Sequence, residues 1–133
     1  MMDANELEIL IGEVEARRDT VQAELDSVEN EIYDFDKADH LTEEQYNDSL
    51  DDIYGDVSVA GSTYSTSYLL KEVDPIAYRV GFSDFADSLD YDYFSEYVEL
   101  TERKTSLEEA IDDLQDEIAE LQDELDDLLD QED

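Results

Sequence analysis

A heptad repeat in the last third of the chain constrains the fold more than any other feature of the sequence. Its apolar residues follow one another at alternating steps of four and three: Leu107, Ile111, Leu114, Ile118, Leu121, Leu125 and Leu128. Tyr93, Tyr97, Leu100 and Lys104 extend the same register towards the N-terminus. Such spacing places the side chains on one stripe of an α-helix, as in a coiled-coil seam. We therefore predict a long helix over residues 93–130 that packs against a second helix.

The second helix is predicted at the other end of the chain, over residues 4–35. Its apolar positions are Leu7, Leu10, Ile11, Val14, Val21, Leu25, Val28, Ile32 and Phe35. Arg17 and Arg18 interrupt this stripe, and we interpret the interruption as a stutter, which locally unwinds a coiled coil. We expect both arginines to pair with acidic residues of the facing helix, such as Asp113 or Asp116.

The aromatic residues separate these two ends from the middle of the chain. All nine Tyr and all four Phe lie between Tyr33 and Tyr97. We predict a mainly α, single-domain fold with three regions. Residues 1–35 and 93–133 form a long antiparallel helical hairpin, a coiled-coil stalk. Residues 36–92 form a small α+β head that contains a short β-hairpin. When the two helices pair in this antiparallel arrangement, we expect Phe35 to lie near Tyr97 and Leu7 to lie near Leu125. A coiled coil between chains is the alternative.

A capping signal opens the first predicted element of the middle region. The segment Thr42-Glu43-Glu44-Gln45 has the form of a capping box, in which the first and fourth side chains satisfy each other's backbone N–H groups. This predicts a short helix to about Leu50. Its inner face would carry Tyr46, Leu50 and Ile53.

A β-hairpin and a further helix are predicted next. Val57-Ser58-Val59 alternates apolar and polar residues, and Gly61 suits a tight turn, so this segment is typical of a hairpin. Ser65 or Ser67 can cap the helix that follows, because a serine oxygen accepts a hydrogen bond from the first helical turn.

The pair Asp74-Pro75 predicts the end of that helix and the beginning of another, since proline suits a first helical turn. We expect Gly81 to bend or end the new helix, and residues 83–89 to form a further short helix. Arg79 lies in this region, where cations are scarce, and either pairs with Asp74 or Asp84 or contacts a partner protein.

The charge of the chain limits where it can fold and what it can bind. The sequence has 42 acidic and seven basic residues, a net charge of −35. At 1 M salt the screening length falls to about 3 Å, so strong brine removes most of the self-repulsion. The composition is typical of proteins from salt-in halophilic archaea and their viruses. A DNA-mimicking surface is the alternative explanation. A nucleic-acid binder is excluded because nothing would neutralise phosphates.

Part of the middle region resembles a known group of proteins. The segment from Tyr64 to Phe85, with its Asp74-Pro75-Ile76-Ala77-Tyr78-Arg79 helix after a glycine-containing hairpin, resembles small uncharacterised proteins of tailed phages and haloarchaeal tailed viruses. The likeness covers residues 41–92. It implies a viral or proviral origin, and it implies no activity. The order of helix, hairpin region and helix is also similar to the layout of prefoldin, which makes a prefoldin-like holdase an alternative function.

Enzymatic chemistry finds no support among the residues. The chain has no Cys, and its one histidine, His40, lies beside Asp39 in a predicted surface loop. The four glycines are isolated, so there is no phosphate-binding loop or dinucleotide fingerprint. Acidic clusters at 34–39, 48–56 and 90–92 lack the spacing of an EF-hand. We predict a non-enzymatic protein with no catalytic residue, no metal site and no cofactor.

We predict that the protein acts by binding another protein, or a second copy of itself, as a structural or adaptor component. The candidate contact residues are Tyr64, Tyr68, Tyr78, Arg79, Phe82 and Phe85, because tyrosine and arginine are enriched at binding hot spots. Packing of these rings inside the head is the alternative. The first six residues lack the basic flank and apolar stretch of a signal peptide, and no apolar run approaches the length that spans a bilayer. We therefore expect the protein in the cytoplasm of a high-salt host or in a virus particle, with no membrane contact.

Overall fold

The computed structural model describes residues 2–131, which fold into two compact units. The two ends of the chain, up to Asp34 and from Glu99, make one unit, and residues 35–98 make the other. The fold is mainly helical, with one two-stranded antiparallel sheet. These features confirm the predicted mainly α fold and the short β-hairpin.

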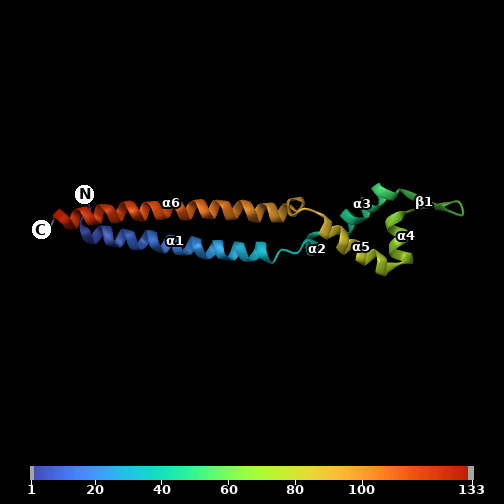
Figure 1. The fold of residues 1–133 in the computed structure, drawn as a ribbon, viewed down its shortest axis with the longest axis horizontal. Coiled ribbons are helices and arrows are strands. Elements are labelled where there is room, and N and C mark those ends of the chain that lie inside the picture. Colours follow the sequence, from blue (N-terminus) through green and yellow to red (C-terminus); the bar gives the residue numbers. More distant parts are fainter. Residues whose placement is uncertain (1, 132–133) are drawn as a thin grey trace. The chain divides into compact units, whose positions relative to one another are not determined.

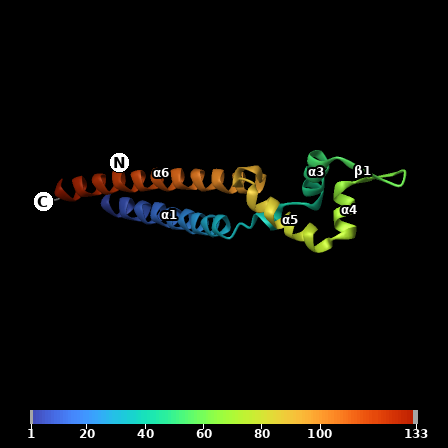
Figure 2. The ribbon, with the colours of Figure 1, turned by 45° about the vertical axis from the view of Figure 1, so that its right-hand side comes forward.

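The terminal unit is an antiparallel helical hairpin. Helices α1 (Ala4–Tyr33) and α6 (Ser95–Gln131) run side by side in both views, with the first and last described residues at the same end (Figures 1 and 2). Asp3 begins α1 by accepting a hydrogen bond from the Glu6 N–H at 2.8 Å, as an N-cap carboxylate does. The predicted pairing of the two long helices is confirmed.

The core of this unit is the predicted seam. Val14 is fully buried and clusters with Ile11 and Ile118. Four leucines pack against this cluster: Leu10, Leu114, Leu121 and Leu125. Further along the two helices, Leu7, Leu25, Val28 and Ile111 are also buried. Val21, Ile32, Leu107 and Leu128 are half-buried. Burial of one stripe from each helix holds the pair together, because each fully buried aliphatic side chain contributes about 1.5–3 kcal/mol.

The stutter expected at Arg17 and Arg18 was wrong. Helix α1 is continuous, and Arg18 is half-buried between the seam residues Val14 and Val21, at steps of four and three. Arg18 thus occupies a seam position, and no extra step is needed. The expected ion pair with the facing helix was wrong as well, because Arg18 contacts the adjacent Asp19 at 3.2 Å. The residues described give Arg17 no ion pair.

The ends of the two long helices differ from the prediction by two residues each. Helix α1 ends at Tyr33 instead of residue 35, so Phe35 lies beyond it. Tyr93 belongs to the short 3₁₀ helix η1 (Tyr91–Tyr93) and is half exposed, so it does not extend the seam of α6. Tyr97 does lie beside Phe35, with ring centroids 5.3 Å apart, as expected.

The middle unit consists of short helices and the hairpin. Its elements are α2 (Lys37–His40), α3 (Glu43–Tyr54), β1 (Asp56–Val59), β2 (Ser62–Ser65), α4 (Thr66–Val73), α5 (Pro75–Ser88) and η1. Helix α4 packs against both α3 and α5, and α2 packs against α5. The strands project beyond α3 and α4 in both views (Figures 1 and 2).

Side-chain caps fix the beginning of each longer helix in this unit. Thr42 and Gln45 form the predicted capping box of α3. Ser65, and not Ser67, caps α4 by accepting from the Tyr68 N–H. Asp74 ends α4 and caps α5, whose first residue is Pro75. Local chemistry therefore sets these boundaries, as predicted.

Two expectations for the middle unit were wrong. Helix α3 continues to Tyr54 rather than ending near Leu50, and Ile53 is 69% exposed instead of facing inward. Helix α5 passes through Gly81 to Ser88 without a break. Gly81 is needed for packing, because a Cβ at this position would clash with the hydroxyl of Tyr46.

Two groups of rings form the core of the middle unit. Tyr46 is buried and lies 5.1–5.7 Å from the ring centroids of Tyr78, Phe82 and Phe85. Phe35 is buried among Tyr91, Phe94, Tyr97 and His40. Most of these pairs are edge-to-face, and an aromatic pair in that geometry adds about 0.5–1.5 kcal/mol beyond area burial.

Candidate functional site

One segment of this highly charged chain carries no charge at all. Residues 57–70 include no Asp, Glu, Lys or Arg, and no other uncharged run in the sequence exceeds four residues. The run covers most of β1, all of β2 and the first half of α4. Counting the residues between successive charges reveals this run from the sequence alone.

The strand register places the apolar residues of the hairpin on one face. Val57 pairs with Tyr64, Ser58 with Thr63, and Val59 with Ser62. Paired residues point to the same side of a sheet, and successive residues alternate sides. Val57, Val59 and Tyr64 therefore share one face, while Ser58 and Thr63 lie on the other.

This face is open to solvent. Val59 is 53% exposed, and Val57 and Tyr64 are each more than a third exposed. Tyr68 of α4 extends the surface, because its ring is 53% exposed and stacks on Tyr64 with centroids 5.9 Å apart and planes 11° from parallel. We call Val57, Val59, Tyr64 and Tyr68 the hairpin surface. It consists of apolar and aromatic groups that no charged side chain interrupts along the chain.

Hydrogen bonds at the base of the hairpin hold this surface in place. Asp51 of α3 accepts from the N–H and the hydroxyl of Ser67, at 2.9 and 3.0 Å. Thr66 donates its hydroxyl hydrogen to the Gly55 carbonyl at 2.7 Å. The turn residues Ala60 and Gly61 both have positive φ, 50° and 83°, as a two-residue type I′ turn requires. The surface is therefore anchored at its base.

The six predicted contact residues fall into two groups. Tyr64 and Tyr68 lie together on the hairpin surface. Tyr78 is buried, and its hydroxyl donates a hydrogen bond to the Asn47 side-chain oxygen at 2.5 Å. Phe82 and Phe85 are half-buried against Tyr46, in the packing arrangement weighed as the alternative.

Arg79 is exposed on α5. The expected pairing with Asp74 or Asp84 was wrong, since neither carboxylate forms an ion pair with it among residues 2–131. Asp74 instead caps α5 through the Ala77 N–H. Arg79 lines a small pocket with Glu43, Tyr78, Phe82 and Ser83.

An apolar cleft of about 510 Å³ lies between α3, α4 and α5. Its lining includes Tyr46, Ser49, Leu50, Ile53, Tyr54, Thr66, Leu70, Ala77, Gly81 and Phe85. No charged residue lines it, and its polar groups are the hydroxyls of Tyr46, Ser49, Tyr54 and Thr66. Ile53 and Tyr54 are more than two-thirds exposed. The shape and the mainly apolar lining of the cleft suit an apolar group.

The perturbed ionisable groups of the middle unit have structural causes. Burial, with the nearby Tyr78 and Asp84, raises the pKa of the Tyr46 hydroxyl. Burial and Glu43 likewise raise the pKa of Tyr78, although Lys71 opposes that shift. The Glu43 carboxylate, 3.1 Å away, raises the pKa of Lys71. Phenols with raised pKa values stay protonated at neutral pH.

No group of three His, Asp or Glu side chains within residues 2–131 is placed to hold a metal ion. His40 is exposed and ends α2, where its ring stacks on Phe35 with centroids 4.1 Å apart.

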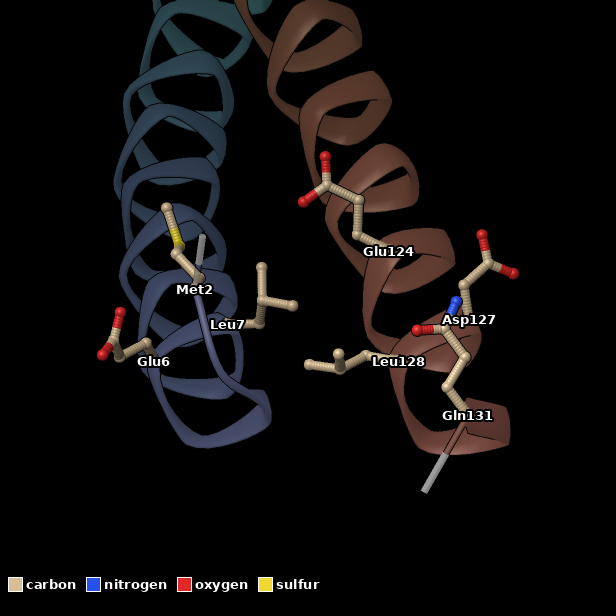
Figure 3. A pocket seen from close by; sticks show the side chains of 7 residues that line it. All are labelled: Met2, Glu6, Leu7, Glu124, Asp127, Leu128 and Gln131. Atoms are coloured by element: carbon tan, nitrogen blue, oxygen red, sulfur yellow. The ribbon is translucent and has the colours of Figure 1, made fainter. Parts of the chain in front are cut away.

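A second pocket, of about 650 Å³, lies at the end of the helical hairpin. Leu7 and Leu128 point towards one another there, while Glu6 and Asp127 point away (Figure 3). Glu124, by contrast, extends from α6 towards α1 in the same view. The pocket is therefore the open end of the apolar seam, where two leucine side chains lie beside one acidic side chain.

Within the described part of the chain, no helix combines the length and the apolar character needed to cross a bilayer. Comparison with protein-family models, with curated proteins and with solved structures finds no match to this chain.

Proposed function

We propose that this protein is a non-enzymatic interaction protein that binds another protein chain through the hairpin surface. The observation that carries the proposal is the exposed face formed by Val57, Val59, Tyr64 and Tyr68, which lies within the longest uncharged run of the chain. Exposed apolar and aromatic groups gathered in one place mark interaction sites. Tyrosine rings also give a large contact area at a low entropic cost.

The rest of the molecule fits a supporting role in this proposal. In our proposal the α1–α6 hairpin is a coiled-coil stalk, and the acidic exterior keeps the protein soluble in the brine of a haloarchaeal host or its tailed virus. A protein with a net charge of −35 repels other acidic proteins over most of its surface. An uncharged surface is where a neighbouring protein can approach without that repulsion.

The hairpin surface favours protein binding over DNA mimicry. A DNA mimic presents carboxylates at the spacing of phosphates, and residues 57–70 present none. The acidic residues are instead distributed over both units, including the α1–α6 hairpin. A DNA mimic would be displaced from its target by duplex DNA, so insensitivity to added DNA is a direct discriminator.

Site-specific photocrosslinking tests the proposed surface. Tyr64 is replaced by p-benzoylphenylalanine, and the protein is irradiated in a host lysate at about 2–3 M KCl, where repulsion is screened. Tyr33, which is 89% exposed at the end of α1, carries the same group in a control protein. We expect Tyr64 to give a discrete crosslinked protein band and Tyr33 to give none.

Mass spectrometry of the crosslinked products also identifies the bound chain, because it distinguishes a crosslink to a second copy of this protein from a crosslink to a different protein. Equal, diffuse labelling from both positions would contradict the proposal, since it would mean that the hairpin surface is contacted no more specifically than any exposed side chain. Loss of the Tyr64 product on adding duplex DNA would favour the DNA-mimic alternative.

A further inference from the structure

We infer that the protein chain bound at the hairpin surface is a second copy of this protein, with the two hairpin surfaces packed face to face about a two-fold axis. The inference rests on the proposed function and adds the identity of the partner. Its support comes from charge, from the strand register and from the exposure of the strands.

The absence of charge discriminates between kinds of partner. A basic partner would favour acidic residues at its binding site, and this chain has 42 of them available. An acidic partner would favour lysine or arginine, and residues 57–70 have neither. A surface without positive or negative charge suits a partner whose facing surface is also uncharged. The hairpin surface of a second copy of this protein has that property.

Two-fold symmetry makes the exclusion of charge necessary. In such an interface the same patch lies on both sides, so a residue near the axis faces its own copy. A single aspartate there would place two like charges together in a desolvated contact. Val57, Val59 and Tyr64 avoid this conflict, whereas Asp56 and Lys71 bound the uncharged run on either side.

The hairpin is anchored at its base, but its strands are exposed. All residues of β1, and three of the four in β2, are exposed. An isolated two-stranded hairpin is at best marginally stable in water, and a covered apolar face stabilises it. Packing against the equivalent face of a second copy would bury the valines and the Tyr64–Tyr68 pair between two sheets, at the usual spacing of about 10 Å.

The size of the surface predicts a weak dimer. Two four-residue strands and one additional ring bury less area than a standard interface, so we place it in the class below about 1,200 Å² in total. Such dimers dissociate on dilution. Salt should strengthen the association, because the remaining surfaces of both copies carry like charge.

The test compares two aspartate substitutions on the same strand. Val59→Asp places a carboxylate on the hairpin surface, and Ser58→Asp places one on the opposite face of β1, at a residue that is also exposed. The mass of the full chain is followed by light scattering and sedimentation through a dilution series in 3 M KCl. We expect a dimer for the unsubstituted protein and for Ser58→Asp, and dimerisation at least tenfold weaker for Val59→Asp.

Circular dichroism shows whether each variant remains folded, and Val59→Cys supplies a second readout that does not depend on affinity. The chain has no cysteine, so mild oxidation should give a disulfide-linked dimer from Val59→Cys and little from Ser58→Cys. A dimer that survives Val59→Asp would overturn the inference by locating the interface elsewhere. A monomer at every concentration would also overturn it, while a Tyr64 crosslink to a different protein would leave the proposed function standing.

Discussion

The absence of a side chain at Gly81 leaves room for the ring of Tyr46. A Cβ on Gly81 would clash with the Tyr46 hydroxyl, while the ring carbon that bears the hydroxyl would remain at 3.4 Å, an ordinary contact. Tyr46 is buried and packs against three other rings. The hydroxyl alone therefore makes glycine necessary in the middle of α5.

We predict that Gly81→Ala destabilises the protein, although alanine is the better helix former. Overpacking costs about 1–3 kcal/mol, which exceeds the gain of about 1 kcal/mol in helix propensity. Tyr46→Phe removes the clashing hydroxyl, so in that background Gly81→Ala should be neutral or stabilising. The coupling between the two positions is measured by urea unfolding, in high salt, of the unsubstituted protein, the two single variants and the double variant. Equal effects of Gly81→Ala in both backgrounds would contradict this account.

The residues that could be predicted from the sequence are those whose role is local. The capping box at Thr42, the cap at Ser65 and the Asp74-Pro75 boundary depend on neighbours within four residues, and all three are present. Gly81 was misjudged because its role depends on Tyr46, which is 35 positions away in the sequence. No local pattern distinguishes a glycine that breaks a helix from one that admits a ring.

At the scale of the element, α1 shows how a charged residue can be mistaken for an interruption. Arg18 follows Val14 by four residues and precedes Val21 by three, so it continues the heptad spacing. A stripe defined by apolar residues alone has a gap there, while the helix itself has none. Arginine can occupy such a position because its long aliphatic stem lies along the apolar seam while its charged end reaches solvent.

We predict that Arg18→Leu raises the melting temperature of the helical hairpin. Leucine at a half-buried seam position should add about 1 kcal/mol of apolar burial, and the exposed contact to Asp19 that it removes contributes little. Arg17→Leu is the matched control, since Arg17 is exposed and lies outside the seam. Thermal unfolding of both variants is followed by circular dichroism at 222 nm in 3 M KCl. Equal changes in the two variants would mean that Arg18 is not a seam residue.

The candidate site was only partly predictable, for a related reason. Tyr64 and Tyr68 could be named from their residue type, and they lie together on the hairpin surface. Tyr78 was named on the same grounds, but it is buried and hydrogen-bonded to Asn47. Residue type cannot separate an exposed ring from a packed one. The alternation of Val57, Ser58 and Val59 predicts that the two valines share a face, but it does not show whether that face is covered or exposed.

At the scale of the whole molecule, the stability of the fold should depend on salt more than on any single contact. The described residues contain two ion pairs, Arg18–Asp19 and Lys71–Glu43, and neither of them is fully buried. Most of the 42 acidic residues therefore have no compensating cation. After Lys104 the chain has fourteen acidic residues and no basic one. Like charges at i and i+4 destabilise a helix, so α6 requires screening by ions.

We predict that lowering KCl from 3 M to about 0.05 M reduces the melting temperature by roughly 10 °C or more, because a loss of 2–3 kcal/mol shifts a small domain by about that much. Salt could stabilise the fold by screening the acidic charges or by strengthening apolar burial, and acidification distinguishes the two effects. Carboxyl groups in general are about half protonated near pH 4, so acidification makes the protein less negative without added salt. If self-repulsion is the cause, helicity and melting temperature at 0.05 M KCl should recover on moving from pH 7 to about pH 4. A protein that melts equally early at both pH values in low salt, and is rescued only by concentrated KCl, would show that salt acts through apolar burial rather than by screening charge.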